Sequence, residues 1–455
     1  MKQRFILSLV LFIFFVISST VYANYQSNFS KTVYNKTSSP VDSSISIIDN
    51  NELLQYAINN SLQGNGQKSN PIIFENLNLI SSNSNYQIEI QNTNLYVIIR
   101  NSTINFALKE GIFLQNVSNI ILYGNSFKMN TGDAIYILSS SNIEIQNNTF
   151  TETKSAPTYS DPFGLQNYPF TIDVAYSDNV TIYNNNLHDN WDGIWFWGGD
   201  TNCKAINNTI YNHHFEGIGA GAYQSSHNIT IANNSINNVR YGVWLVGDGG
   251  PTLVMNNNVI NSSDGIIIQK TSFTTVKNNS FSFNLRTGIS FLTDSQNISS
   301  SYNIIRNNSY GFYIVGSNLE IHYNDLINNT DSAFTISNDN INISYNFWST
   351  YTNGSDNNND GILDDPLKID GIYDLYDNYP LVHSVFGNYT TINYSLTGIT
   401  KESTTSSNFT DIAKVSITTS NSSQSSNLSF LITDPVLLIS LSLMSLLIKR
   451  RKKSY

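Results

Sequence analysis

The chain has 455 residues, only 12% of them charged, and its formal net charge is −10. A charged fraction so far below the usual ~25% argues against a coiled coil, and the acidic balance argues against a nucleic-acid-binding protein. The single cysteine, Cys203, excludes an intrachain disulfide and a cysteine-rich metal site.

The first residues have the pattern of a secretory signal peptide, which we predict over 1–23. Lys2 and Arg4 supply the basic start, Phe5–Ile17 is apolar, and Val21–Ala23 is a small-x-small cleavage site. A polar N-terminal segment and a capping helix are expected over 24–70. Asp49 and Glu52 have capping-box spacing ahead of an amphipathic run.

The middle of the chain repeats one short phrase, apolar-x-x-Asn-x-apolar. The interval is mostly 21 to 26 residues, with one of 37. A Gly and an alternating strand follow each phrase, as at Gly193 and Gly242. A period near 23 residues with short β segments predicts a parallel β-helix, which we place at 71–348 with about 11–12 coils. The repeated residues should form a buried structural ladder of amides: Asn125, Asn148, Asn185, Asn208, Asn234, Asn257, Asn279, Asn303, Asn324 and Asn346.

The remaining segments predict a surface-anchored protein. A C-terminal cap is expected over 349–386 and a Ser/Thr/Asn-rich stalk over 387–429. A transmembrane helix is expected over 430–448 and a basic cytoplasmic tail over 449–455. The 22 Asn-x-Ser/Thr sequons predict glycosylation if the chain is exported. An anchor that a sorting enzyme removes has the same three parts, so it stays an alternative.

The Gly-Ile strands and phrases such as Asn147-Asn148-Thr149-Phe150 resemble the right-handed parallel β-helix superfamily of carbohydrate-binding proteins and sugar hydrolases. The nearest branch resembles the repeat domain of NosD, a periplasmic protein associated with copper delivery. Asn346–Ser349, Asp360–Pro366 and Asp377–Leu381 resemble the terminal segment of archaeal surface members. The resemblance covers roughly Pro71–Leu381 and implies an all-β, right-handed parallel β-helix there. With the helical N-terminal cap and the C-terminal membrane helix predicted above, this gives the expected fold class. It leaves the activity open, because the superfamily includes binding proteins and enzymes.

A calcium loop is predicted at 356–364. Oxygen ligands stand at calcium-loop positions, with Gly361 for the turn and a backbone carbonyl after it: Asp356, Asn358, Asp360, Ile362 and Asp364. Leu367 stands where a full EF-hand needs Glu, so a polar turn without metal is the alternative. Copper is not expected, because six His and four Met give it few ligands.

A ligand-binding groove is predicted where coils carry outward tryptophans. Trp195 and Trp244 should lie two coils, or roughly 10 Å, apart, with Gly219 leaving a notch between them. Trp197, His213 and Arg240 complete the predicted ligand-binding residues, since sugar rings stack on exposed aromatics. If the groove is catalytic, a pair such as Asp173 with Asp192 or Glu216 would act on a glycosidic bond.

We therefore predict a cell-surface β-helix protein that binds carbohydrate or another component of the cell envelope. An enzyme that cleaves or epimerises polysaccharide is the first alternative. A structural or adhesion spacer, in which the solvated turns have no ligand, is the second.

Overall fold

The computed structural model describes residues 43–153, 169–221, 226–247, 249–337, 339–351 and 354–387, and two later strands. The chain divides into two compact units, residues 1–172 and 173–455. The predicted signal peptide, the basic tail and most of the predicted membrane span lie outside the described residues. They stay predictions.

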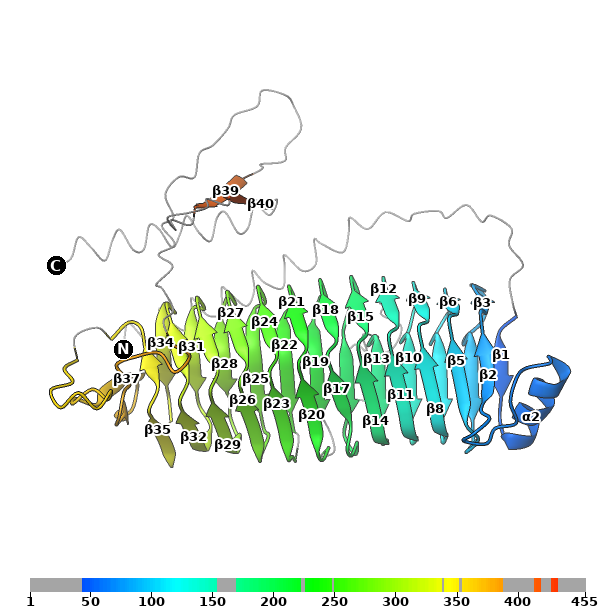
Figure 1. Ribbon diagram of the computed structural model, residues 1–455, viewed down its shortest axis with the longest axis horizontal. Helices are drawn as coiled ribbons and strands as arrows, with labels where there is room; N and C mark the ends of the chain where they lie inside the picture. Colours follow the sequence, from blue (N-terminus) through cyan, green and yellow to red (C-terminus); the bar gives the residue numbers. More distant parts are fainter. Residues whose placement is uncertain are drawn as a thin grey trace, which may run out of the picture. The chain divides into compact units, whose positions relative to one another are not determined.

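Unit 1 is built from short parallel strands that recur in threes, one in each of three sheets (Figure 1). Each strand pairs with the strand one coil later, so Ile112 of β7 is opposite Ile135 of β10. Sheet A contains β1 (Ile45–Ile47), β4 (Ile88–Gln91), β7 (Ile112–Gln115) and β10 (Ile135–Leu138). Sheet B contains β2 (Ile72–Glu75), β5 (Val97–Arg100), β8 (Ser118–Tyr123) and β11 (Ser141–Gln146). Sheet C contains β3 (Asn78–Leu79), β6 (Thr103–Asn105), β9 (Ser126–Lys128) and β12 (Thr149–Thr151).

Unit 2 repeats the same three-sheet plan. Sheet A contains β13 (Ile172–Ala175, whose first residue belongs to unit 1), β16 (Ile194–Trp197), β19 (Glu216–Gly221), β22 (Tyr241–Val246), β25 (Asp264–Gln269), β28 (Thr287–Phe291), β31 (Tyr310–Ile314), β34 (Asp331–Thr335) and β37 (Leu367–Gly371). Sheet B contains β14 (Asp178–Tyr183), β17 (Lys204–Ile206), β20 (Ile229–Ala232), β23 (Thr252–Met255), β26 (Thr274–Lys277), β29 (Gln296–Ser301), β32 (Ser317–His322), β35 (Ile341–Ser344) and β38 (Leu375–Asp377). Sheet C contains β15 (Asn186–His188), β18 (Thr209–Tyr211), β21 (Ser235–Asn237), β24 (Asn258–Ile260), β27 (Ser280–Ser282), β30 (Ile304–Arg306), β33 (Asp325–Ile327) and β36 (Phe347–Trp348). The predicted parallel β-helix is confirmed, with about eleven turns in all.

The core of unit 2 lies between the three sheets, because alternate side chains of each strand point inward. The predicted inward column of sheet A is fully buried: Ile194, Ile218, Val243, Ile266, Ile289 and Phe312 are each 0% exposed. The Gly before each of these residues is required by stacking. A Cβ added at Gly193 would lie 1.9 Å from the carbonyl oxygen of Gly217 in the next coil.

The predicted asparagine ladder forms, and its amides satisfy the backbone of a buried turn. The Oδ1 of Asn257 accepts the backbone N–H of Asn234 at 2.9 Å, and its Nδ2 donates to the carbonyl of Ile231 at 2.8 Å. Neighbouring members repeat these bonds, and all ten predicted asparagines are buried. In unit 2 the ladder ends on Asp377, which accepts from Asn346 and, at 2.8 Å, from the indole N–H of Trp348.

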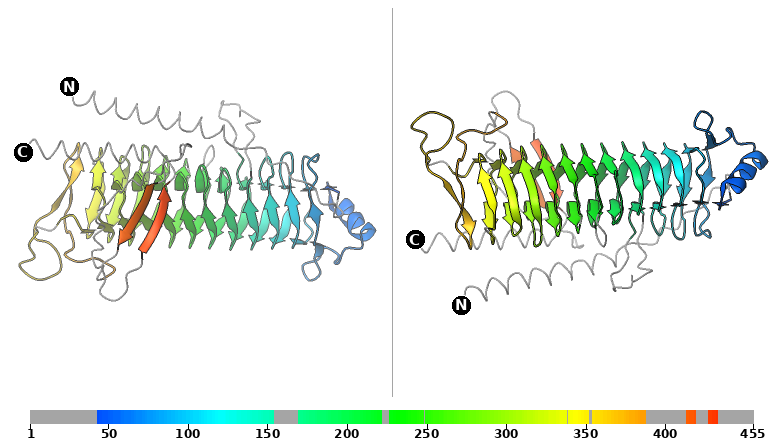
Figure 2. Two further views of the ribbon diagram at one scale, coloured as in Figure 1. Left: turned by 90° about the horizontal axis from the view of Figure 1, so that it is seen from above. Right: turned by 90° about the horizontal axis from the view of Figure 1, so that it is seen from below.

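A helix forms where the capping box predicts one: α2 (Asn50–Asn59) begins after Asp49, whose side chain accepts the N–H of Glu52. It lies at the end of unit 1 (Figure 2) and buries Leu53 and Ala57. The β-helix begins earlier than predicted. β1 precedes α2 and already pairs with β4, so part of the expected polar segment belongs to the first coil.

The C-terminal side departs from the repeat. β37 and β38 lie in the predicted cap, where they pair antiparallel with each other and parallel with β34 and β35 of the preceding coil. Within the predicted stalk, β39 (Ala413–Thr418) and β40 (Asn427–Ile432) pair as an antiparallel hairpin. β40 includes Phe430–Ile432, so the first residues of the predicted membrane helix are in a strand. In the part of the chain that the structure describes, no helix combines the length and apolarity needed to cross a membrane.

Candidate functional site

The outward column of sheet A in unit 2 has the predicted register. Trp195 is opposite Gly219, and Gly219 is opposite Trp244. The column continues through Ile267, Ser290, Tyr313 and Phe334. Parallel pairing of successive coils therefore brings the predicted tryptophans onto one face of β16, β19 and β22.

The predicted notch at Gly219 is wrong, because the indole of Trp195 fills it. A Cβ added at Gly219 would lie 1.8 Å from Cζ3 of Trp195, and Trp195 is only 3% exposed. The ring centroids of Trp195 and Trp244 are 5.6 Å apart, in place of the expected 10 Å. The indole leans along the axis into the space that glycine leaves free. Gly219 thus lets two coils share one aromatic surface.

Five aromatic side chains meet on this face, and we call them the aromatic platform: Trp195, Trp197, Phe215, Tyr241 and Trp244. Their centroids are 5.2 to 5.8 Å apart and most pairs are edge-to-face, which favours aromatic contact. Trp197, Tyr241 and Trp244 are partly exposed. Sequence reasoning missed Phe215, although its place one residue before Glu216 put it at the same turn.

Arg240, predicted to bind ligand, is exposed at the edge of the platform. Its guanidinium carbon lies 4.9 Å from the ring centroid of Phe215 and 5.0 Å from that of Tyr241. Cation–π contacts of this kind hold a guanidinium in place while its N–H groups stay available. Arg240 forms no ion pair with any residue that the structure describes.

Two of the predicted catalytic carboxyls form a buried pair beside the platform. Oδ1 of Asp192 accepts the backbone N–H of Glu216 at 3.0 Å, and the two residues are 3% and 2% exposed. Burial raises the pKa of Asp192, and burial together with the charge of Asp192 raises the pKa of Glu216 well above its usual value. Oε2 of Glu216 has no hydrogen-bond partner among the described residues. The pair is therefore set to hold at least one proton at neutral pH.

Asp173, the third predicted carboxyl, lies in β13, which pairs with β16. The Asp173 residue is 7% exposed. Asp192 and Glu216 contact each other. All three assignments stay predictions, because nothing in the fold itself requires catalysis.

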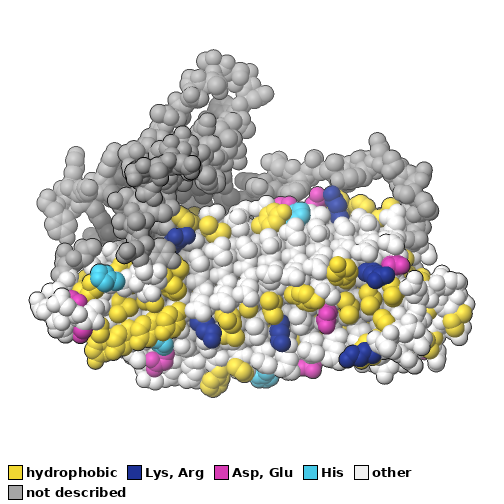
Figure 3. Space-filling view, in the orientation of Figure 1, with side chains coloured by type: hydrophobic (Ala, Val, Ile, Leu, Met, Phe, Trp, Pro, Cys, Tyr) yellow, Lys and Arg dark blue, Asp and Glu magenta, His cyan; other side chains and the backbone are white. Residues whose placement is uncertain are grey.

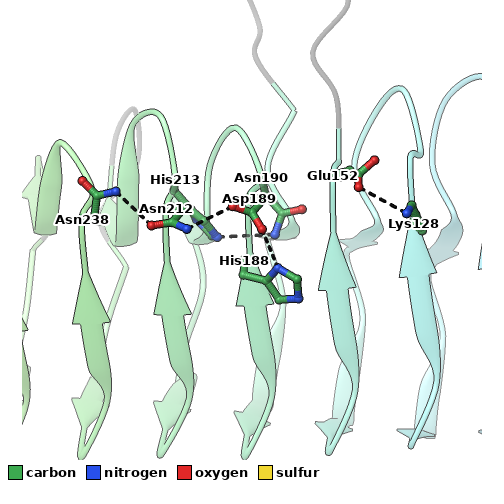
Figure 4. A network of polar contacts seen from close by, with 8 residues as sticks. All are labelled: Lys128, Glu152, His188, Asp189, Asn190, Asn212, His213 and Asn238. Carbon is green, nitrogen blue, oxygen red and sulfur yellow. Dashed lines mark hydrogen bonds and ion pairs between the residues drawn. The ribbon is translucent and has the colours of Figure 1, made fainter. Parts of the chain in front are cut away.

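His213 is not on the surface as predicted; it belongs to a second buried ladder. Its Nε2 lies 3.4 Å from Nδ2 of Asn190, as Figure 4 shows, and its exposure is 4%. Burial lowers the pKa of His213 to about 4, so the ring is neutral. Other coils use Ser262, Asn284, Asn308 and Asn329 at this position. The signal was available: each member stands five residues after a member of the first ladder.

The exposed side of the same turn carries a chain of polar contacts (Figure 4). His188 bonds Oδ2 of Asp189 at 2.8 Å, Asn212 donates to Oδ1 of Asp189 at 3.1 Å, and Asn238 donates to Asn212 at 2.9 Å. Asp189, Asn212 and Asn238 all have positive φ, a conformation that Asn and Asp tolerate. These contacts hold successive turns together and leave the platform as the candidate ligand site.

The predicted calcium loop folds as a hydrogen-bonded turn. Asp356 accepts the backbone N–H groups of Asp360 and Gly361, at 3.1 and 3.0 Å. Oδ2 of Asp364 accepts from the backbone and side chain of Asn357. Over the ranges that the structure describes, no group of three or more His, Cys, Asp or Glu is placed to hold a metal. Calcium binding by Asp356, Asn358, Asp360, Ile362 and Asp364 therefore stays a prediction.

Comparison with known proteins identifies the fold family. The family model described as right handed beta helix region matches residues 19–210, 158–281 and 217–363. The chain belongs to this family. The NosD-like and archaeal parts of the predicted resemblance stay predictions. A search of curated proteins gave no match.

Solved structures with a similar fold include carbohydrate-active proteins. The A-module of mannuronan C-5 epimerase AlgE6 from Azotobacter vinelandii is 11% identical, with a TM-score of 0.37, over 61% of this chain and 84% of that one. The periplasmic alginate epimerase AlgG is 12% identical, with a TM-score of 0.41, over 67% and 79%. The tailspike of E. coli bacteriophage HK620, solved with a pentasaccharide, is 11% identical, with a TM-score of 0.41, over 65% and 60%. These values concern the fold alone.

Proposed function

We propose that this protein binds carbohydrate at the cell exterior, through the aromatic platform and Arg240. The observation that carries the proposal is the guanidinium held against Phe215 and Tyr241, next to the partly exposed ring of Trp244. Aromatic faces take the apolar faces of sugar rings, and fixed N–H donors take hydroxyl or carboxylate oxygens. One surface thus offers both kinds of contact that a sugar needs.

The test measures retention of the purified protein on immobilised polysaccharides, neutral and acidic. Trp244→Ser removes one of the two partly exposed indole rings of the platform, and Ser already occupies the same column at Ser290. Loss of one aromatic stacking contact, about 1.5 kcal/mol at most, should lower affinity about tenfold. Arg240→Gln should weaken binding in the same direction. Unchanged thermal unfolding of each variant would show that the fold is intact.

The matched control is Tyr323→Asn. Tyr323 is an aromatic residue at a turn next to sheet B, where an earlier coil has Asn278 with the same positive φ. This variant should keep full affinity. The proposal fails if the wild-type protein is retained on no glycan, or if Trp244→Ser and Tyr323→Asn bind alike. Failure on every glycan would favour the structural or adhesion alternative.

A second candidate, a polysaccharide-modifying enzyme, is favoured by the Asp192–Glu216 pair. Carboxyls with a raised pKa are common at catalytic sites, where one acts as acid and the other as base. Both are buried, so a substrate would reach them only after neighbouring side chains move. The same incubations should be assayed for new chain ends and for altered sugar stereochemistry. New products that Glu216→Gln abolishes, with binding kept, would establish the enzyme.

A further inference from the structure

A second aromatic group lies further along the outer face of sheet A in unit 2. Tyr310, Tyr313 and Phe334 have ring centroids 6.1 to 6.3 Å apart, and each side chain is partly exposed. In Figure 3, hydrophobic side chains gather over the last coils of unit 2. We call these three residues the distal aromatics.

The distal aromatics and the platform share one column. Trp244 is followed by Ile267, Ser290 and Tyr313 in successive coils. Three coil spacings of about 4.8 Å place Tyr313 about 14 Å from Trp244 along the axis. The side chains between them are smaller than the rings at either end. A ligand that touches both groups must therefore be a chain running along the axis.

The edge of this face carries two exposed arginines. Arg240 precedes Tyr241 and Arg286 precedes Thr287, and these two residues stand in one register column with Asp264 between them. The arginines are thus two coils, or about 10 Å, apart. Arg286 is 59% exposed at its side chain, and its Nε lies 3.4 Å from Oδ1 of Asp264. In a chain with 23 basic residues against 33 acidic ones, this edge therefore presents two aligned, exposed guanidiniums.

The polar groups between the aromatics are fixed by their own contacts. Thr287 donates to Oδ1 of Asp264 at 2.7 Å and contacts the hydroxyl of Ser290 at 2.8 Å. Arg286 is therefore anchored through Nε by a buried carboxylate, while its side chain stays largely exposed. The register column of Asp264 and Thr287 continues through Tyr310 to Asp331. Asp331 is acidic and exposed, so the row of exposed basic residues ends there.

We propose that the ligand is an anionic glycan chain that runs along the axis, from the platform to the distal aromatics. This rests on the proposed function and names its ligand class. Arg240 and Arg286 bind carboxylates on two separated sugars, and Tyr313 stacks on a sugar at the far end. Guanidinium groups recognise carboxylates by paired N–H donors, which neutral sugars cannot use in the same way.

The stacked tyrosines near sheet B do not form such a site. Tyr302, Tyr323, Tyr345 and Tyr379 stack with centroids 5.0 to 5.3 Å apart. Their ring faces cover one another, and the turn has no aligned pair of arginines. This stack is explained by like residues packing in successive coils.

The experiment measures affinity of the full protein for three probes by calorimetry: hexagalacturonate, digalacturonate and the neutral maltohexaose. We expect hexagalacturonate to bind at least tenfold more tightly than either of the others. Arg286→Ser and Tyr313→Ser should each weaken hexagalacturonate binding about tenfold and leave digalacturonate binding unchanged. Serine is already present in the neighbouring coils, at Ser263 and Ser290.

Lys277→Ser is the matched control for charge. It removes one positive charge from sheet B, where the column continues with Ser301. It should change affinity less than twofold. An equal loss in Lys277→Ser and Arg286→Ser would overturn the proposal, since it would show general electrostatics. The proposal of an anionic ligand would be overturned if maltohexaose bound as tightly as hexagalacturonate. It would also be overturned if Arg286→Ser had no effect while Trp244→Ser lost binding. In both cases the proposed function, carbohydrate binding, would stand. No binding of any glycan would refute both.

Discussion

The asparagine ladder should be the largest polar contribution to the stability of unit 2, and Asn257→Ala tests this. Asn257 lies in the middle of the ladder and is 2% exposed. Its Oδ1 accepts from the backbone N–H and from the side chain of Asn234, both at 2.9 Å. Its Nδ2 donates to the carbonyl of Ile231 and to Oδ1 of Asn279. Alanine removes all four bonds and adds no substitute.

The expected loss follows from the groups left without a partner. The side chain of Asn234 keeps its bond to Ala205, and Oδ1 of Asn279 keeps the backbone N–H of residue 257. The N–H of Asn234 and the carbonyl of Ile231 are left with one hydrogen bond fewer. At about 1–3 kcal/mol for each buried polar group, the free energy of unfolding should fall by about 2–6 kcal/mol.

Tryptophan fluorescence in urea measures this loss, because all five tryptophans lie in unit 2. The control is Asn256→Gly, one residue earlier. Asn256 is exposed and has φ of 56°, which glycine adopts without strain, so its effect should stay within about 0.5 kcal/mol. A loss below 1 kcal/mol for Asn257→Ala would refute the reasoning. It would mean that water replaces the ladder amides at little cost.

Two further predictions concern charge and metal. The pKa values of Asp192 and Glu216 are raised in the folded state, so the stability that the pair contributes is complete below their usual values of 3.8 and 4.5. It is lost as pH rises through the folded-state values, which for Asp192 is about 8. The unfolding temperature of the wild-type protein should therefore fall as pH rises over that range. Glu216→Gln should make this fall shallower, whereas the control Glu320→Gln on sheet B should leave it unchanged. If the fall with pH is equally steep in the wild type and in Glu216→Gln, the buried carboxyl pair does not have the raised pKa values. Calcium should raise the unfolding temperature of the wild-type protein but not of Asp356→Asn, with magnesium as the comparison. No shift in the wild type would show that the loop is a metal-free turn.

The repeat made most of the fold predictable. The Asn phrase, the Gly before each inward residue and the period near 23 residues all express one constraint, the stacking of like residues in successive coils. The ladder members and the inward column of sheet A were predicted correctly for this reason. The ends were predicted only in part: the capping box located α2, but the pairing of the outermost strands was missed, because an end has only one neighbouring coil. β1, β37 and β38 carry no ladder phrase, yet they pair with the repeat.

The candidate site was predicted in register but not in shape. The column through Trp195, Gly219 and Trp244 follows from counting residues. The lean of the Trp195 indole does not, because it depends on the space above a glycine in the next coil. His213 was misplaced for a different reason. A histidine in a polar turn is expected to be exposed. Its burial could be predicted only by recognising a second ladder, whose members stand five residues after those of the first.

Departures from the column pattern point to the same part of unit 2. Stacked coils favour like residues, so two adjacent buried carboxyls, Asp192 and Glu216, are costly where a neutral residue would serve. A glycine in the outward column at Gly219 gives up side-chain contact, and His213 replaces an amide in a ladder. All three lie in β19 or in the turns that precede β16 and β19. A sequence selected for folding alone has no reason to concentrate such costs in neighbouring coils, next to the surface that carries Trp244 and Arg240. The proposed ligand at that surface would supply the reason.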